Sequence, residues 1–412
     1  MNHTASRHAV WLILLAAAGT FALTMGTRQT MGLFLADVNT ATGLGIANIS
    51  LAFAFGQLWW GLTQPFAGAF ADRIGAGRVL LIGVSLVALG TILTPLMTST
   101  AGLIFAIGVL AAGGAGMAGP SVLMAATTRM LPAAKRGMAT GIVNAGGSFG
   151  QFVMAPVAAG LTAALGWMTA MQALGLIVLL ALPAAWVLRG NSSQSAAPVA
   201  APNGTAAPAR EGTRAAIARA LADPSYRLLA CGFFVCGFHV AFLGTHLPNV
   251  VAMCGLPPSV SAWSLSLLGL FNIVGSLAMG WAVGRWRMKS LLSLDYAARG
   301  VAVLIFLLSP KTATTMLIFA AVMGVTFLST VPPTAGLVAK FFGPANMATL
   351  FGIVMLSHQI GGFLGAWLGG KVFTLTGSYD TIWILDILLA FGAALAHLPI
   401  REAVLPPTVQ AA

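Results

Sequence analysis

Twelve long apolar segments, joined by short polar connections, are the feature that most constrains how this chain can fold. Each segment is long enough to cross a bilayer, which takes about 20 residues of helix. Only 7% of the 412 residues are charged, whereas soluble domains carry about 25%. Backbone groups inside lipid must be satisfied within the chain, so we predict an all-α polytopic membrane protein. The predicted spans lie near residues 9–35, 47–71, 78–97, 101–130, 138–163, 168–189, 226–252, 259–283, 290–309, 313–340, 346–374 and 380–399.

One long polar segment divides these spans into two sets of six. Residues 190–225 begin with an Ala-, Pro-, Ser- and Asn-rich stretch that has the composition of a disordered linker. Residues 211–221 are predicted to form a short helix on the membrane surface. We therefore expect two pseudo-symmetric six-helix bundles with the boundaries 1–189 (N-terminal bundle), 190–225 (cytoplasmic linker), 226–400 (C-terminal bundle) and 401–412 (cytoplasmic tail).

The basic residues favour one side of the membrane. Lys and Arg lie at the N-terminus, in the linker, in the C-terminal tail and in the connections on that same side, whereas the opposite side receives only Lys311 and Lys371. By the positive-inside rule, both termini and the linker are cytoplasmic. We expect a monomeric, multi-pass protein of the cell (inner) membrane. The net charge of +12 is spread over short connections, so no nucleic-acid partner is expected.

Weak internal matches relate the two sets of spans. Gly26-Thr27-Arg28 in span 1 matches Gly244-Thr245-His246 in span 7, and Met138-Ala139-Thr140 in span 5 matches Met347-Ala348-Thr349 in span 11. These pairs fall in corresponding spans of the same orientation. Such matches indicate two parallel six-span repeats.

The connection between spans 2 and 3 resembles the signature of the major facilitator superfamily. It runs from Gly68 through Asp72-Arg73 and Gly75 to Arg78, and its degenerate copy after span 8 has Gly284-Arg285. The resemblance implies a secondary transporter that works by alternating access. A carboxylate here can cap a neighbouring helix N-terminus and keep the cytoplasmic side closed. The predicted gate comprises Gly68, Asp72, Arg73, Gly75, Arg78 and Arg285.

A narrower resemblance is to the monocarboxylate porters and their bacterial oxalate/formate-type relatives. It rests on Thr27 to Phe34 in span 1, Lys135 to Pro156 in span 5, and Gly166-Trp167. The resemblance implies a small organic anion as the substrate. Eukaryotic members carry an acid and an arginine one turn apart in span 8, where this chain has Asn272 and Ser276. The chemistry of that pair therefore cannot be carried over.

Arg28 is a permanent charge within the first apolar segment. Placing it there costs at least about 2.5–3.5 kcal/mol, so something must compensate it. We predict that its planar fork binds the substrate carboxylate, with Gln29 as a neighbouring donor. The alternatives are that it extends to the membrane surface or pairs with Asp37.

His246 is the repeat counterpart of Arg28, and we expect the two to face each other across a central cavity. A histidine titrates near neutral pH, so His246 is also the predicted proton carrier; the alternative is a neutral ring bonded to a backbone carbonyl. The other predicted substrate-binding residues, each with a helix-packing alternative, are His239, Asn249, Asn272, His358, Gln359 and Asn144.

Three further features have structural interpretations. Asp295 and Arg299 are spaced to neutralise each other on one helix face. Asp386 in span 12 has no partner that the sequence identifies. Pro332-Pro333 should kink or break span 10.

No phosphate-binding loop, metal site or catalytic triad occurs in the sequence. We therefore predict no enzyme activity and no cofactor, with a proton gradient or a counter-anion as the driving force. The predicted function is secondary transport of small organic anions, monocarboxylates above all, by proton symport or anion exchange. Two alternatives stay open. One is a proton-driven efflux carrier for hydrophobic or cationic compounds, which needs a central acid, although Asp37 and Asp295 lie at span ends. The other is a non-transporting membrane sensor on the same fold.

Overall fold

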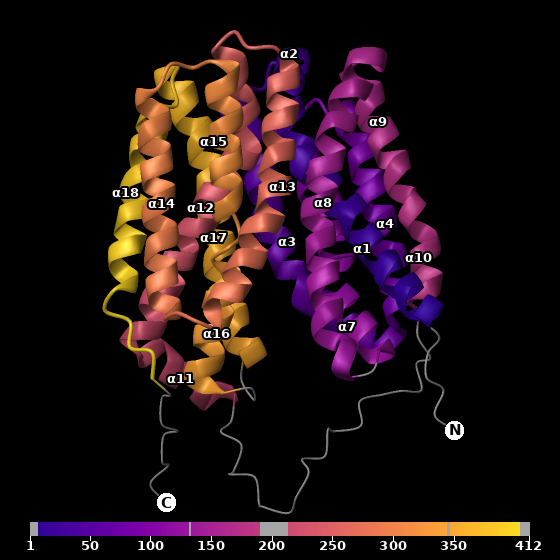
Figure 1. Cartoon of the computed structure of the whole chain (residues 1–412). Helices are drawn as coiled ribbons and strands as arrows, with labels where there is room; N and C mark the ends of the chain where they lie inside the picture. Colours follow the sequence, from indigo (N-terminus) through magenta and orange to yellow (C-terminus); the bar gives the residue numbers. More distant parts are fainter. Residues whose placement is uncertain (1–6, 132, 190–212, 344–346, 404–412) are drawn as a thin grey trace, which may run out of the picture.

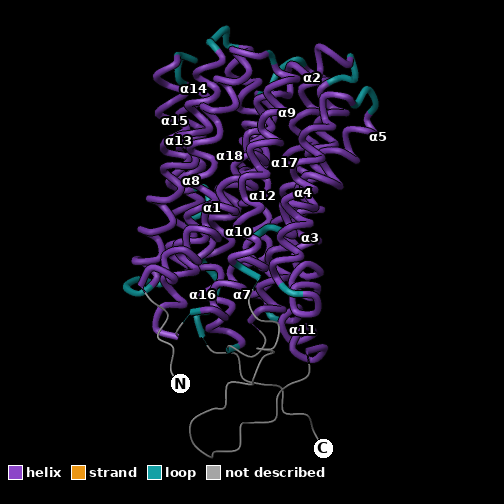
Figure 2. The backbone as a smooth tube through the Cα atoms, turned by 90° about the vertical axis from the view of Figure 1, so that its right-hand side faces the viewer, coloured by secondary structure: helices purple, strands orange, loops and turns teal. Residues whose placement is uncertain are grey.

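The computed structural model describes residues 7–131, 133–189, 213–343 and 347–403, and their regular structure is helical throughout. The helices of residues 7–189 lie side by side, and those of residues 213–403 lie next to them (Figure 1). We call these two sets the N-terminal half and the C-terminal half. Figure 2 shows that the loops gather at two ends of the molecule. We name these ends the α2 end and the α11 end after the helices found there (Figure 1).

The N-terminal half is built from long helices with several local irregularities. Its elements are α1 (Arg7–Thr30), η1 (Met31–Phe34), α2 (Leu35–Thr42), α3 (Ile46–Ile74), α4 (Ala76–Leu93), η2 (Thr94–Leu96), α5 (Thr100–Leu103), η3 (Ile104–Ala112), α6 (Gly113–Met117), α7 (Pro120–Met130), α8 (Ala133–Leu165), α9 (Trp167–Val178), η4 (Leu179–Ala181) and α10 (Leu182–Val187). The segment η3 is a π-helix, a widened form that is frequent at functional sites.

The C-terminal half begins with the short helix α11 (Thr213–Ala222). The predicted surface helix at residues 211–221 agrees with it, whereas the predicted linker at 190–212, residues 1–6 and the end of the tail at 404–412 lie outside the described residues. The other elements are α12 (Pro224–Met253), α13 (Pro258–Val283), α14 (Met288–Leu308), α15 (Ala313–Thr326), α16 (Val331–Phe342), α17 (Met347–Thr376) and α18 (Asp380–His397).

Eleven segments of the described chain are long and apolar enough to cross a membrane by length and composition. The second predicted span, which forms α3, is not one of them although it has 29 residues. Its polar residues Asn48, Gln57 and Gln64 lower its hydropathy. In Figure 1, α3 lies at the centre of the molecule, where polar side chains can meet protein or water instead of lipid.

The tenth span is interrupted as predicted from Pro332-Pro333. Helix α15 ends at Thr326 and α16 begins at Val331. A proline has no N–H and clashes with the preceding turn, so an α-helix cannot continue through this point unbroken. The break leaves backbone N–H and carbonyl groups in the interior, which other residues must satisfy.

Glycines bring pairs of helices into close contact in both halves. A Cβ atom at Gly150 of α8 would lie 2.0 Å from the carbonyl oxygen of Ala22 in α1. In the other half, a Cβ at Gly237 of α12 would lie 1.8 Å from the carbonyl oxygen of His358 in α17. The two crossings involve corresponding helices of the predicted repeats. Small residues at such crossings let backbones pack closely in a membrane.

The two halves touch in the middle and towards the α2 end. A Cβ at Gly32 would lie 2.2 Å from the Gly244 carbonyl oxygen, and one at Gly370 would lie 2.2 Å from Ser50 Oγ. Nearer the α11 end, four glycines would gain no neighbour within 4 Å from an added Cβ: Gly68, Gly141, Gly280 and Gly352. The close approaches between the halves are thus concentrated away from the α11 end.

Candidate substrate site and buried charge network

Arg28 lies in the last turn of α1 and is directed at α3. One Nη2–H donates to Gln57 Oε1, and the guanidinium Cζ lies 4.9 Å from the centroid of the Trp60 ring. Gln57 and Trp60 share a face of α3 because they are three residues apart. Within the described ranges, no carboxylate pairs with Arg28, so the alternative pairing with Asp37 is not seen. Nη1 also lies 3.8 Å from Met25 Sδ, so the charge is held by a neutral amide, a thioether and an aromatic face.

A small cavity adjoins Arg28. Its volume is about 30 Å³, and its lining includes Met31, Gln57 and, from the π-helix η3, Ile107 and Ala111. A cavity of this size holds one or two water molecules. It is too small for an organic acid in this conformation. All its lining residues belong to α1, η1, α3, α4 and η3, so the cavity lies within the N-terminal half.

Helix α17 brings His358 and Gln359 to the face of α3 that carries Gln57 and Gly61. The Gln359 side chain packs so closely on α3 that a Cβ at Gly61 would lie 2.3 Å from its Cγ. Both ring nitrogens of His358 and Gln359 Nε2 are buried without a hydrogen-bond partner in the described chain, and so is Trp60 Nε1. Such unpaired buried groups are costly. Such unpaired groups are expected at a site where a polar ligand forms the missing hydrogen bonds.

The remaining predicted site residues of α1 and α8 give no evidence of a role beside Arg28. Gln29 is partly buried, and its Oε1 has no partner among the described residues. Asn144 on α8 is exposed. Neither side chain is brought to Arg28 by any contact that the structure records.

His246 does not face Arg28, which corrects the expectation from the internal repeat. Its ring is fully buried within the C-terminal half: Nδ1 lies 3.1 Å from the Tyr379 hydroxyl and Nε2 lies 2.8 Å from the Ala366 carbonyl oxygen. Asn249 donates to the same Tyr379 hydroxyl at 2.9 Å. Both ring nitrogens are therefore satisfied, and the geometry matches the alternative interpretation of a neutral, structural histidine.

Asn272 links the two halves and also accepts a hydrogen bond from a backbone N–H group where the tenth span is interrupted. Its Nδ2 donates to Ser148 Oγ of α8 at 2.8 Å, and its Oδ1 accepts from the backbone N–H of Leu328 at 3.1 Å. Ser276 Oγ is 3.3 Å from the same Oδ1. One buried amide thus connects the N-terminal half with the α15–α16 connection.

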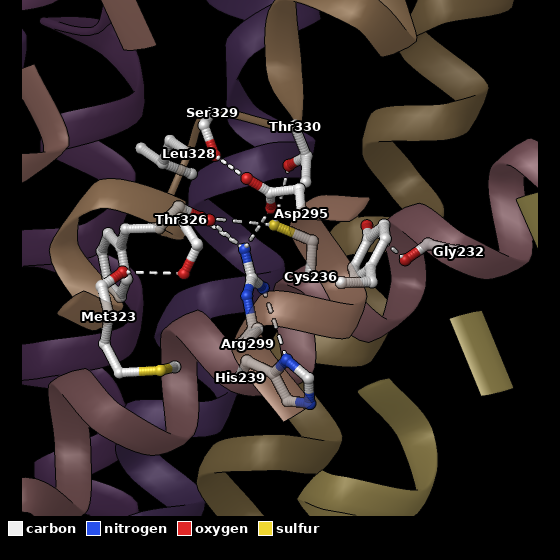
Figure 3. A network of polar contacts seen from close by, with 12 residues as sticks. Gly232, Cys236, His239, Asp295, Arg299, Met323, Thr326, Leu328, Ser329 and Thr330 are labelled. Carbon is white, nitrogen blue, oxygen red and sulfur yellow. Dashed lines mark hydrogen bonds and ion pairs between the residues drawn. The ribbon is translucent and has the colours of Figure 1, made fainter. Parts of the chain in front are cut away.

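Arg299 binds the carbonyl groups that precede Leu328 at this break (Figure 3). It is fully buried, and its Nη2 donates to the carbonyl oxygens of Thr326 and Phe327. Carbonyls at the C-terminal end of a helix carry partial negative charge and favour a cation. Asp295 Oδ2 lies 3.5 Å from Arg299 Nη2, and its Oδ1 accepts from Ser329 Oγ at 2.6 Å. The predicted pairing of Asp295 with Arg299 is present, but it belongs to a larger network.

His239 extends this network to α18. Arg299 Nη1 lies 3.3 Å from His239 Nδ1, and His239 Nε2 lies 3.0 Å from Asp386 Oδ1 and 3.1 Å from the Asp386 carbonyl oxygen. Asp386 and His239 are both fully buried. The sequence offered no sign of this contact, because the two residues are 147 positions apart.

The predicted gate residues lie at the α11 end. Asp72 forms an ion pair with Arg129 in the last turn of α7, and both side chains are at least half exposed. The expected capping of a helix N-terminus is therefore not seen. Gly75 joins α3 to α4 with φ +92°, a conformation that favours glycine. Gly68 is open, Arg73 and Arg78 are exposed, and Arg285 lies 4.0 Å above the Trp281 ring.

Comparison with known families gives the fold its context. The family profile described as Major Facilitator Superfamily matches residues 16–366 and also residues 229–411. The chain belongs to the major facilitator superfamily. It is therefore a multi-pass membrane transporter and not an enzyme, and the predicted all-α architecture is confirmed. The overlapping second match begins in α12, where the C-terminal half repeats the pattern of the first.

Several characterised relatives resemble this superfamily member over most of their length. Monocarboxylate transporter 13 of Rattus norvegicus is 25% identical over 400 residues, covering 94% of this chain and 89% of the relative. The gallate transporter of Pseudomonas putida is 27% identical, with 89% and 86% covered, and the oxalate:formate antiporter of Oxalobacter formigenes is 24% identical, with 93% and 89% covered. A crystal structure of the nucleoside transporter NupG superposes with a TM-score of 0.76 at 14% identity, covering 95% of this chain and 99% of that one. The resemblance to monocarboxylate and oxalate/formate transporters is thus confirmed at the level of sequence similarity.

Proposed function

We propose that this transporter carries small organic anions, monocarboxylates above all, and that Arg28 binds the substrate carboxylate. The observation that carries the proposal is a guanidinium within a membrane span with no carboxylate partner among the described residues. An intramembrane charge of this kind needs a counter-charge. A carboxylate supplied by the substrate neutralises it and matches the guanidinium fork with two parallel hydrogen bonds.

The surroundings of Arg28 fit an anion better than a cation or a sugar. Trp60 Nε1–H and Gln359 Nε2–H are unpartnered donors, and His358 offers two unpartnered ring nitrogens. An acid bound to Arg28 leaves its other oxygens for these donors. A hydrogen bond to a charged group contributes about 1.5–3 kcal/mol, so two or three of them make specific binding feasible. Relatives named for monocarboxylate, gallate and oxalate:formate transport support the same substrate class.

The orientation that we assign places the α11 end in the cytoplasm. Basic residues gather at this end, including Arg73, Arg78, Arg129, Arg189, Arg285, Arg287, Lys289 and Lys340, as the positive-inside rule requires. The halves touch towards the α2 end, so the conformation is inward-facing with the outer side closed. Binding of an organic acid requires more space than the 30 Å³ cavity beside Arg28 offers, so helices of the cavity wall such as α3, α4 and η3 must move apart.

The proposal is tested by counterflow in proteoliposomes. Vesicles loaded with an unlabelled compound are diluted into the same compound carrying a label, and the panel comprises pyruvate, L-lactate, oxalate and gallate, with xylose and tetraphenylphosphonium as neutral and cationic probes. We expect exchange of at least one acid and of neither comparison compound. Exchange of tetraphenylphosphonium without any acid would favour the efflux carrier. Binding of an acid without exchange would favour the sensor.

A further inference from the structure

Four ionisable side chains form one buried network in the C-terminal half, away from Arg28. They come from three helices: His239 from α12, Asp295 and Arg299 from α14, and Asp386 from α18. None of the four is more than 6% exposed. Figure 3 shows His239 and Asp295 on opposite sides of the Arg299 guanidinium. Charges this deep in a membrane protein are expensive unless they neutralise one another.

The hydrogen-bond directions fix where the protons lie. A guanidinium only donates, so the 3.3 Å contact from Arg299 Nη1 requires an unprotonated Nδ1 on His239. The neutral ring then carries its hydrogen on Nε2, which is directed at the Asp386 carbonyl oxygen, 3.1 Å away. A second proton on the ring would displace Arg299. These contacts fit the neutral tautomer of His239 that carries its hydrogen on Nε2.

With a neutral His239, no cation of the network remains to balance the negative charge of Asp386. Arg299 balances Asp295, which also accepts from Ser329. Asp386 is 0% exposed, and neither carboxylate oxygen receives an aligned hydrogen bond within the described chain, although His239 Nε2 lies 3.0 Å from Oδ1. An unpaired, buried carboxylate costs several kcal/mol. Of the two carboxylates in this network, Asp386 is the one without an aligned hydrogen bond in the described chain.

We propose that Asp386, with His239 beside it, holds the proton that couples transport to a proton gradient. This inference rests on the proposed function, because it makes the carrier a proton symporter in place of an anion exchanger. Loading forms one O–H bond on the Asp386 carboxyl and changes the net charge of the four residues from −1 to 0. Unloading breaks that bond and returns the proton to water on the other side of the membrane.

The network also connects this proton site to the contact between the halves. Asp386 is connected to Arg299 through the His239 ring, and Arg299 also donates to the carbonyls of Thr326 and Phe327 at the helix break. The next residue, Leu328, is held by Asn272, which in turn donates to Ser148 of the other half. Proton loading and the contact between the halves are thus connected through the contacts of His239 and Arg299, the peptide bond between Phe327 and Leu328, and the hydrogen bonds of Asn272.

Other titratable groups surround the network, and Tyr296, His397 and Cys236 have partners there. Tyr296 of α14 donates to the Gly232 carbonyl oxygen at 2.6 Å, and His397 of α18 stacks on Tyr296 and lies 2.7 Å from the Ala393 carbonyl oxygen. Cys236 of α12 is 3.2 Å from Thr330 Oγ1. From α17 comes His358, whose two ring nitrogens have no hydrogen-bond partner among the described residues. The neutral polar residues that α13, α15 and the α15–α16 connection contribute are Asn272, Thr326, Ser329 and Thr330.

The test compares Asp386→Asn with Asp380→Asn, which removes an exposed carboxylate from the first turn of the same helix. Each protein is reconstituted whole, and two rates are measured with the labelled acid that the wild type exchanges fastest. One is exchange without a pH gradient, and the other is accumulation driven by acidic medium outside. We expect Asp386→Asn to keep exchange and to lose gradient-driven accumulation, while Asp380→Asn keeps both. Accumulation by Asp386→Asn at the wild-type level would overturn the proposal, and so would a wild type that exchanges acid but ignores the gradient.

A second measurement does not depend on the substrate. Infrared difference spectra of the purified protein between acidic and alkaline buffer report carboxyl protonation directly. Because Asp295 is a second buried carboxyl, we expect the protonated-carboxyl band to lose one component in Asp386→Asn and none in Asp380→Asn; a band in Asp386→Asn identical to that of the wild type would overturn the proposal. Should Asp386→Asn fail to fold, His239→Gln replaces it, and a titration midpoint of the band unchanged from wild type would count against the site. If the wild type exchanges no acid at all, the proposed function fails, and the infrared result still decides whether the proton site exists.

Discussion

Arg28 of α1 stacks on Trp60 of α3, with 4.9 Å between Cζ and the centroid of the indole ring. The ring covers one face of the guanidinium, while a single amide, Gln57, occupies one of its N–H groups. Met25 Sδ lies 3.8 Å from Nη1, and the remaining N–H groups of the fork are available to a ligand. A cation–π contact contributes about 0.5–2 kcal/mol, which helps to keep Arg28 in place while no anion is bound.

Trp60→Phe should weaken substrate binding with little effect on folding. Phenylalanine keeps an aromatic face for Arg28 but lacks the N–H that has no partner in the described chain. We expect KM for the transported acid to rise about two- to tenfold, the value of one hydrogen bond. The matched control is Trp59→Phe, since Trp59 stacks on Phe55 instead. Equal KM values for wild type and Trp60→Phe would remove Trp60 from the site.

Gly237→Ala should destabilise the protein because a Cβ there would lie 1.8 Å from the His358 carbonyl oxygen. Overpacking of this kind costs about 1–3 kcal/mol. The control is Gly352→Ala on α17, where a Cβ meets nothing within 4 Å. Melting temperatures in detergent are the measurement, with a clear drop expected for Gly237→Ala alone. A similar drop in both variants would mean that close packing is not the cause.

Ser148→Ala should shift the balance between the two conformations of the carrier. It removes the hydrogen bond from Asn272 across the halves but leaves the bond of Asn272 to Leu328 intact. We expect a larger population open at the α2 end, measured by the distance between spin labels on α2 and α13. Ser276→Ala, which loses only a bond within α13, is the control. An unchanged distance distribution in Ser148→Ala would show that this contact does not hold the halves.

Tyr379→Phe should alter stability at alkaline pH but not the pH dependence of transport. Tyr379 lies in the connection between α17 and α18, where burial raises the pKa of its hydroxyl and the hydrogen bond from Asn249 partly offsets this. A tyrosine whose pKa is raised in the folded state stabilises fully below its unfolded pKa of about 10, and this stability is lost at higher pH. We expect the melting temperature of the wild type to fall more steeply above that pH than that of Tyr379→Phe. Parallel curves would contradict this.

The contacts of His246 could not be predicted from the repeat alignment. The matched position placed a polar residue opposite Arg28, but Gly369 on α17 lets the His246 ring pack tightly against that helix. There it reaches Ala366 and Tyr379, which are 120 and 133 positions away. A side chain's partners depend on such distant residues, which hydropathy does not reveal.

The features that the sequence did predict are those set by local chemistry. Pro332-Pro333 predicted the break in the tenth span, and the four-residue spacing of Asp295 and Arg299 predicted their pairing. The role of that break in holding Arg299 was not predictable, because the carbonyl of Thr326 and the guanidinium come from different helices. The contact between His239 and Asp386 was missed for the same reason.

The central claim, that Arg28 binds the substrate anion, is tested most directly by counterflow of the accepted labelled acid through Arg28→Gln. The control is Arg287→Gln, which removes an exposed basic residue at the α11 end. Loss of a charge-assisted hydrogen bond is worth about 1.5–3 kcal/mol, or roughly a ten- to hundredfold change in binding. We predict that exchange at low acid concentration falls by that factor in Arg28→Gln and stays at the wild-type rate in Arg287→Gln. Exchange by Arg28→Gln at the wild-type rate would contradict the account.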